Sequence, residues 1–240
     1  MKAARFIFVS SATLLACGLR ADAAGIGAMR AAGDVQDGVG SIRGRVLLGG
    51  DAVPEWDSVT NTIVFLVGDG LEGVEPQPGA SPPILEQRDY TFIPHVLATR
   101  FGVELTITNR DTVTHNIHVF TKSRGRTVFN RAQNAGVTMR ATFRRPDSLL
   151  VLCDIHSYMQ AHILVLPNSV FTKPNEDGSF ILEGVPAGAY ELVAWHKYYT
   201  GRRAVEVLAG ESTRTDIDLA VAPSDIAVPV TRPGAVAPPE

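Results

Sequence analysis

The chain contains the stretch SLLVLCDIHSYMQAHILVL at residues 148–166. Its first six residues are almost continuously apolar, which is typical of a strand in the core of a β-sandwich. A short loop over residues 154–160 follows, and residues 162–166 again form an apolar run. The stretch therefore predicts two adjacent buried strands joined by a tight loop.

The loop region carries side chains that bind metals. Cys153, His156 and Met159 place a thiolate, an imidazole and a thioether within seven residues, and His115 and His118 lie upstream. Two His, one Cys and a weakly bound Met are the ligand set of a trigonal blue-copper site. We therefore expect one copper ion that cycles between Cu(I) and Cu(II), and electron transfer as its use.

One of the two upstream histidines must supply the remaining ligand. His115 and His118 are three residues apart, so on a strand their side chains point to opposite faces. Only one of them can reach the loop, and we expect it to be His115. The other histidines are expected to be structural, because an isolated His more often packs in a sheet than binds a metal: His95, His118, His162 and His196.

The N-terminus predicts export. Residues 1–24 have a basic start, an apolar core over residues 6–19 and small residues at Ala21-Asp22-Ala23, which is typical of a signal peptide. A second interpretation uses Leu14-Leu15-Ala16-Cys17, which resembles a bacterial lipoprotein box and would anchor the chain through a lipid on Cys17. Both interpretations predict a periplasmic or other extracytoplasmic protein.

Cys153 is then the only cysteine of the exported chain. A single cysteine forms no internal disulfide, and a free thiol in an oxidising compartment needs an explanation. Metal ligation supplies one, and a buried, inert cysteine is the alternative. The His and Met residues at fixed spacing favour the ligand.

Composition limits the other functions. The 240 residues are 45% hydrophobic and 20% charged, an ordinary globular composition. The formal net charge of -3 is too mild to indicate a nucleic-acid partner. No stretch after the N-terminal segment is apolar over the roughly 18 residues that a transmembrane helix needs.

The pattern beyond the signal is all-β. Alternating and continuous apolar runs bounded by Gly and Pro predict strands, and no segment shows a helical period. We predict a linker at 25–40, a first β-sandwich at 41–167, a second, smaller β-sandwich at 168–221 with a turn at 175–178, and a disordered Pro-rich tail at 222–240. Predicted strands include residues 41–48, 61–67, 103–108 and 138–143.

The first sandwich resembles the cupredoxins of the plastocyanin and amicyanin type. Asn109 followed by His115-Asn116 resembles the plastocyanin segment with the first His ligand, and Cys153-x-x-His156-x-x-Met159 matches the short amicyanin loop. The resemblance implies a Greek-key β-sandwich. It also implies that the copper ligands are His115, Cys153, His156 and Met159. Asn116 would not be a ligand but would fix the position of the ligand loop.

Two positions depart from the plastocyanin pattern. Thr114 stands where plastocyanin usually has Pro, which weakens the choice of His115 over His118. Leu152 stands where plastocyanin has Tyr, which leaves no aromatic electron path beside Cys153.

The second sandwich resembles a carboxypeptidase-regulatory or transthyretin-like domain, which is an Ig-like β-sandwich. The resemblance lies in residues 176–180, 185–188 and 190–196. It implies a fold and no catalysis, because a fold alone does not specify a function.

The leading hypothesis is a one-electron carrier with a redox protein as its partner and the exposed edge of His156, within an apolar rim, as its electron port. A non-redox protein that sequesters or delivers copper is one alternative, since the same ligands would serve it. A secreted sandwich that binds partners or glycans, with a vestigial copper site, is another. We do not expect an enzyme, because the chain shows no nucleophile elbow, no paired carboxylates and no His clusters for further copper ions.

Overall fold

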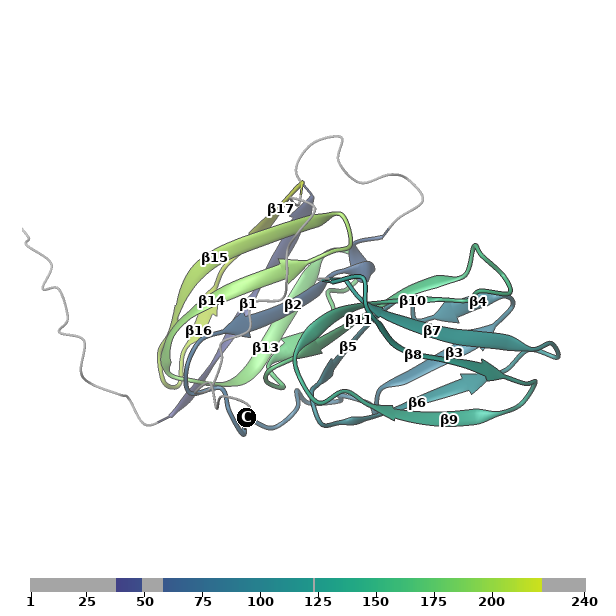
Figure 1. Cartoon of the computed structure of the whole chain (residues 1–240). Helices are drawn as coiled ribbons and strands as arrows, with labels where there is room; N and C mark the ends of the chain where they lie inside the picture. The colour runs from purple at the N-terminus through teal and green to yellow at the C-terminus, as the bar shows by residue number, and fades with distance from the viewer. Residues whose placement is uncertain (1–37, 49–57, 123, 222–240) are drawn as a thin grey trace, which may run out of the picture. The chain divides into compact units, whose positions relative to one another are not determined.

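A computed structural model describes residues 38–48, 58–122 and 124–221, which form three β-sheets (Figure 1). The predicted signal peptide, nearly all of the predicted linker and the predicted tail lie outside the described residues. Within them there is no α-helix, and one 3-10 turn, η1 (Val59–Asn61), is capped by the Ser58 side chain. None of the described segments forms a helix with the length and apolarity that a membrane crossing requires.

The first sheet has five strands and contains the stretch at 148–166. β10 pairs antiparallel with both β7 and β11, and β11 pairs in parallel with β5. The strand–loop–strand prediction is confirmed to within two residues at each end. In sheet order the strands are β5 (Val96–Arg100), β11 (Gln160–Leu166), β10 (Asp147–Leu152), β7 (His115–Thr121) and β8 (Thr127–Gln133).

The second sheet has four strands and covers the apolar face of the first. Its order is β4 (Thr91–Ile93), β3 (Ile84–Arg88), β6 (Glu104–Asn109) and β9 (Thr138–Thr142). Residues that alternate along the strands meet in one buried cluster, as two facing sheets require. Cys153 and Met159 belong to this cluster, together with Leu85, Phe92, Leu105, Ile107, Ile117, Val119, Phe143, Leu149, Val151, Ala161, Ile163 and Val165.

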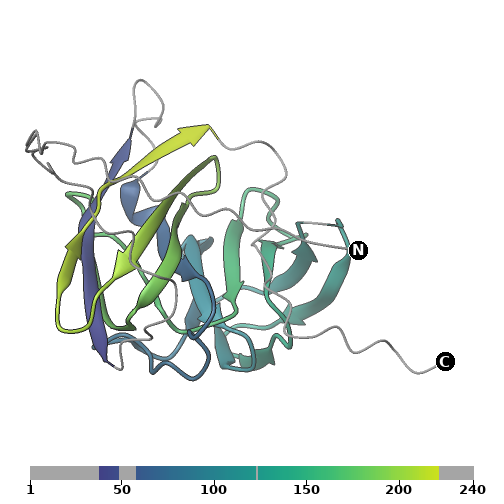
Figure 2. The same ribbon diagram turned by 90° about the vertical axis from the view of Figure 1, so that its left-hand side faces the viewer.

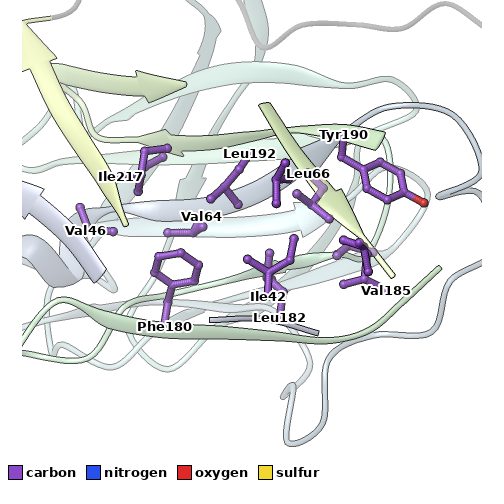
Figure 3. Packing of buried hydrophobic residues seen from close by; sticks show 14 of the residues in the cluster. Ile42, Val46, Val64, Leu66, Phe180, Leu182, Val185, Tyr190, Leu192 and Ile217 are labelled. Carbon is purple, nitrogen blue, oxygen red and sulfur yellow. The ribbon is translucent and has the colours of Figure 1, made fainter. Parts of the chain in front are cut away.

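The third sheet curls around a core of its own, which Figure 3 shows from close by. Side chains such as Ile42 and Leu182 there face Leu66 and Leu192 across the buried space. Its main path is β12 (Phe171–Thr172), β2 (Ile63–Val67), β14 (Gly188–Trp195), β15 (Tyr199–Val207), β17 (Ile217–Val221), β1 (Val39–Leu48) and β13 (Ser179–Pro186), and β16 (Ser212–Arg214) pairs with β1.

The sheet membership of two strands differs from the prediction. We expected residues 41–48 and 61–67 to belong to the first sandwich. Instead β1 pairs with β13, β16 and β17, and β2 pairs with β12 and β14. Figure 2 shows β1, in purple, beside the yellow strands late in the chain. Apolar patterning shows that a strand is buried but does not specify its partner, which explains the difference.

A smaller buried cluster involves the first and third sheets. It lies on the face of each sheet that points away from that sheet's own core. It combines Leu164 and Leu166 of β11 with Phe65 of β2 and Trp195 of β14, and also includes Ile63, Val96 and Val193. The continuous apolar run of β11 follows from this arrangement, because both faces of that strand are covered.

Several strands were not predicted. β8 is largely exposed on both faces, so it lacks the apolar alternation that marks a strand. β3 and β4 are joined by Asp89-Tyr90 and not by the Asn-Gly pair that signals a tight hairpin. The predicted turn at 175–178 is present, with Gly178 N–H donating to the Asn175 carbonyl at 2.9 Å. The strand before it, β12, pairs with β2 and not with β13.

Candidate metal centre

Strand pairing brings the predicted ligand segments together. His115 begins β7, and Cys153 directly follows β10. Because β10 lies between β7 and β11, Leu152 is paired with His118 on one side and with Gln160 on the other. The start of β7 and both ends of the 153–159 loop therefore meet at one end of the five-stranded sheet.

The loop itself is closed by hydrogen bonds. Cys153 N–H donates to the Met159 carbonyl at 3.2 Å, and Met159 N–H donates to the His156 carbonyl at 2.9 Å. His156 N–H donates to Cys153 Sγ at 3.4 Å. These bonds hold the backbone of all three predicted loop ligands in one conformation.

Three donor atoms converge at this loop. Nδ1 of His115 lies 2.9 Å from Nδ1 of His156, and Cys153 Sγ lies 3.9 and 3.8 Å from the same two nitrogens. These atoms all lie within 4.8 Å of one another. His115 is fully buried, Cys153 is 2% exposed, and His156 is partly exposed.

The donor set fits a first-row metal in a trigonal arrangement. Metal–nitrogen and metal–sulfur bonds of about 2.0 and 2.3 Å would place sulfur roughly 3.7 Å from each nitrogen. The two sulfur–nitrogen distances agree with this value, and the shorter distance between the nitrogens is that of a hydrogen bond. A soft thiolate with two imidazoles suits copper in both of its oxidation states.

Met159 lies next to these donors along the chain and in space. It is 1% exposed, and it belongs to the same apolar cluster as Cys153. Its backbone bonds to Cys153 and His156 place it at the end of the ligand loop. The assignment of its thioether as the fourth ligand stays a prediction.

Asn116 links β7 to the ligand loop, as the resemblance implies. Its Oδ1 accepts a hydrogen bond from Asp154 N–H at 2.6 Å. Its Nδ2 donates to Asp154 Oδ2 at 3.0 Å and to Asn130 Oδ1 at 2.7 Å. The residue after Cys153 is thereby fixed to the strand that carries His115.

Asp154 also holds His118 on the far side of β7. His118 Nδ1 lies 2.9 Å from Asp154 Oδ2, and its ring packs on Phe120. The pKa of Asp154 lies below its usual value, chiefly because His118 and Asn130 hydrogen-bond to the carboxylate. The structure thus places His115 with the metal donors, and it places His118 in a surface network behind them.

Asp111 contacts the donor cluster and was not predicted from the sequence. Its Oδ2 lies 2.8 Å from His115 Nε2, the nitrogen that faces away from the donor cluster. Burial opposes ionisation of this carboxyl, but hydrogen bonds from Tyr90 N–H, His115 and Asp89 N–H bring its pKa below the usual value. Asp111 lies in the loop four positions before His115, and no known sequence pattern marks an acidic residue there as a partner of the histidine.

The other described histidines lie outside the donor cluster. His162 is 6% exposed, with its ring against those of His95 and Trp195. Burial, reinforced by the positive charges of Lys122, His95, Lys197 and His196, lowers the pKa of His162 from 6.5 to about 3. His162 is therefore a neutral, packed side chain, and it is not one of the three converging donors.

Comparisons with known proteins concern the fold. No protein-family model matches the chain, and no curated protein matches it. Among solved structures, a purple cupredoxin from Nitrosopumilus maritimus is 21% identical, with a TM-score of 0.32, over 35% of this chain and 99% of its own. A mutant of amicyanin with Cu(I) is 13% identical, with a TM-score of 0.33, over 43% of this chain and 98% of its own.

A copper-containing nitrite reductase from Thermus scotoductus is 22% identical, with a TM-score of 0.33, over 50% of this chain and 28% of its own. The described part of this chain is all-β and is consistent with a cupredoxin-like β-sandwich, since two facing sheets enclose one core.

Replacing Asn116 with Ala should loosen the ligand loop. The N–H and the Oδ2 of Asp154 lose their hydrogen bonds to the Asn116 side chain. Such a loss typically costs about 1–3 kcal/mol of stability when the groups are buried. Metal affinity should fall about 10–100-fold, as for other residues that orient ligands. Thermal unfolding of the apoprotein and copper titration measure both effects. The exposed Asn134→Ala variant is the control, and equal behaviour of the two variants would contradict the prediction.

His162 should make the apoprotein less stable as the pH falls. Because its pKa is about 3 when folded and 6.5 when unfolded, the unfolded chain binds an extra proton between these values. Stability is then lost as the pH drops below 6.5, by up to about 1.4 kcal/mol per pH unit. The free energy of unfolding, measured by denaturant titration at several pH values between 6.5 and 4.5, should fall less steeply with decreasing pH in His162→Gln than in the wild type. An unchanged slope would show that His162 is not held neutral.

Proposed function

We propose that the protein is an exported type 1 copper protein that carries single electrons. The observation that supports this is the convergence of Cys153 Sγ with the Nδ1 atoms of His115 and His156 in a buried, hydrogen-bonded setting. Copper bound there would supply the one-electron Cu(II)/Cu(I) couple, and the thioether of Met159 would tune its potential. No other common site uses this set of side chains.

The surroundings of the ligands suit a carrier. Fast electron transfer requires ligands that keep one geometry in both oxidation states. The backbone hydrogen bonds within the 153–159 loop and the hydrogen bond from Asp154 N–H to Asn116 both restrict that geometry. Burial of His115 and Cys153 keeps water away from the sulfur. Copper delivery would need donors that a second protein can reach, so this burial favours the carrier over a delivery protein.

His156 offers the electron port. Its ring is partly exposed, and the rings of Tyr90 and Tyr158 lie 5.0 and 6.3 Å from it, centre to centre. Tyr90, Ile155 and Tyr158 are 42%, 53% and 68% exposed, so the port has an apolar rim. We propose that a redox protein docks on this rim and exchanges electrons through the imidazole edge.

The rest of the chain has supporting roles in this proposal. Residues 1–24 would direct export, with or without a lipid anchor at Cys17. Residues 168–221 would form a carboxypeptidase-regulatory or transthyretin-like module, which shares its sheet with β1 and β2. The one group of metal donors found among the described residues would hold the single copper ion that a one-electron carrier needs.

Copper-loaded, oxidised protein should show an intense absorption band at about 600 nm from Cys153-to-copper charge transfer. Cys153→Ser should abolish this band, because an alkoxide or hydroxyl oxygen cannot provide it. Ser157→Ala, an exposed change in the same loop, is the matched control and should keep the band. A Cys153→Ser variant with an intense visible band would refute the site assignment.

Met159→Leu should retain copper and the band while the reduction potential rises. The change removes a weak donor, which costs the more highly charged Cu(II) more than Cu(I), and it leaves an apolar side chain of similar size in the core. The rise is about 59 mV for each tenfold loss of Cu(II) affinity relative to Cu(I). Protein-film voltammetry measures it, and an unchanged potential would exclude Met159 from the axial position.

A further inference from the structure

The hairpin between β3 and β4 has a turn that is unfavourable for its residues. Arg88 pairs with Thr91, so Asp89 and Tyr90 alone make the connection. Their φ angles are 53° and 56°, both in the left-handed region. This tight turn favours Asn-Gly, because residues with large side chains are strained there. A strained turn persists only where its surroundings hold it.

The carboxylate of Asp111 holds this turn. Its Oδ1 accepts a hydrogen bond from Asp89 N–H at 2.7 Å, and its Oδ2 accepts one from Tyr90 N–H at 3.0 Å. The N–H of Asp111 itself donates to Asn109 Oδ1 at 2.9 Å. The Asp111 side chain is only 10% exposed, while the two turn N–H groups that it binds lie at the surface.

The same carboxylate oxygen contacts the buried histidine of the metal centre. Asp111 Oδ2 lies 2.8 Å from Nε2 of His115, a residue with no exposed surface. An ionised carboxylate only accepts hydrogen bonds, so the proton of neutral His115 must lie on Nε2. The Nδ1 lone pair is then directed at His156 and Cys153, where the metal donors converge.

The turn also places an aromatic ring over the centre. The ring of Tyr90 lies edge-on to the ring of His115, at 5.7 Å and 87°, and to the ring of His156, at 5.0 Å and 89°. The backbone of Tyr90 is left-handed, and its N–H in that conformation donates to Asp111. One carboxylate thus fixes both the buried imidazole and the ring that covers the pair.

We propose that Asp111 is a positioning residue that selects the Nδ1-donor form of His115 and biases the centre toward Cu(II). The inference rests on the proposed copper site. A carboxylate on the distal N–H makes an imidazole a stronger donor, and its negative charge stabilises the more highly charged ion. The strained Asp89-Tyr90 turn has a role in this arrangement, because its two N–H groups hold Asp111 in place.

The first test uses the wild-type apoprotein and needs no copper. Long-range ¹H–¹⁵N NMR spectra of the imidazoles, at about pH 8 where an ordinary histidine is neutral, report which nitrogen carries the proton. We expect the proton of His115 on Nε2 and that of His156 on Nδ1, donating to His115 Nδ1. A proton on Nδ1 of neutral His115 would overturn the proposal, whatever metal the protein binds.

The second test compares Asp111→Asn with Glu86→Gln. Glu86 lies on the same hairpin but pairs with Arg88 and Arg110, so its variant removes a nearby carboxylate that touches no ligand. For Asp111→Asn we expect Cu(II) affinity to fall about 10–100-fold, with a smaller loss for Cu(I). The potential should then rise by about 59 mV for each tenfold difference between these losses.

The outcomes separate this inference from the proposed function. Circular dichroism of each apoprotein checks that it is folded. If Asp111→Asn does not fold, the imidazole NMR spectrum of the wild-type apoprotein still tests the inference. Equal potentials and equal affinities in Asp111→Asn and Glu86→Gln would overturn the role of Asp111 while the blue band stands. Absence of that band in wild-type protein would refute the copper site itself and with it the bias toward Cu(II).

Discussion

The contact between the ligand loop and β7 is the constraint on which the candidate site depends. A thiol and an imidazole of one loop share one small space with the imidazole of His115, from a distant part of the sequence, because Asn116 fixes the residue after Cys153. Backbone bonds within the loop then determine where His156 and Met159 lie. Since each of these bonds is made by the protein itself, the donor geometry is a property of the fold.

A network of buried amide side chains fixes the strands next to the loop that carries Asp111. Gln133 Nε2 donates to the carbonyls of Ile107 and Val137, and Gln87 Nε2 donates to Gln133 Oε1. Asn109 Nδ2 donates to the carbonyls of Val113 and Gln133. Buried polar groups are costly unless they are paired, so a network of this kind specifies one arrangement of β3, β6 and β8. The loop that carries Asp111 begins at Asn109 and inherits its position from this network.

The third sheet shows how chain order and spatial order differ in this protein. β1 and β2 precede the metal-binding sandwich in sequence, yet they pair with strands that follow it. The sandwich is therefore inserted between two parts of one sheet. Because the chain enters and leaves the sandwich through that sheet, the smaller module depends on strands from both sides of the insertion. A boundary drawn along the sequence at residue 168 misses this arrangement.

The sequence by itself determined the all-β character, the strand–loop–strand stretch and two of the residues that converge as donors, Cys153 and His156. These features are local: apolar runs mark buried strands, and the spacing from Cys153 to Met159 limits how a short loop can present its ligands. Only the tertiary structure decided that His115, and not His118, joins Cys153, and that Asp111 and Tyr90 complete the surroundings. It also decided which sheet takes β1 and β2. Those outcomes depend on pairing between distant segments and on backbone conformations that local patterns do not encode.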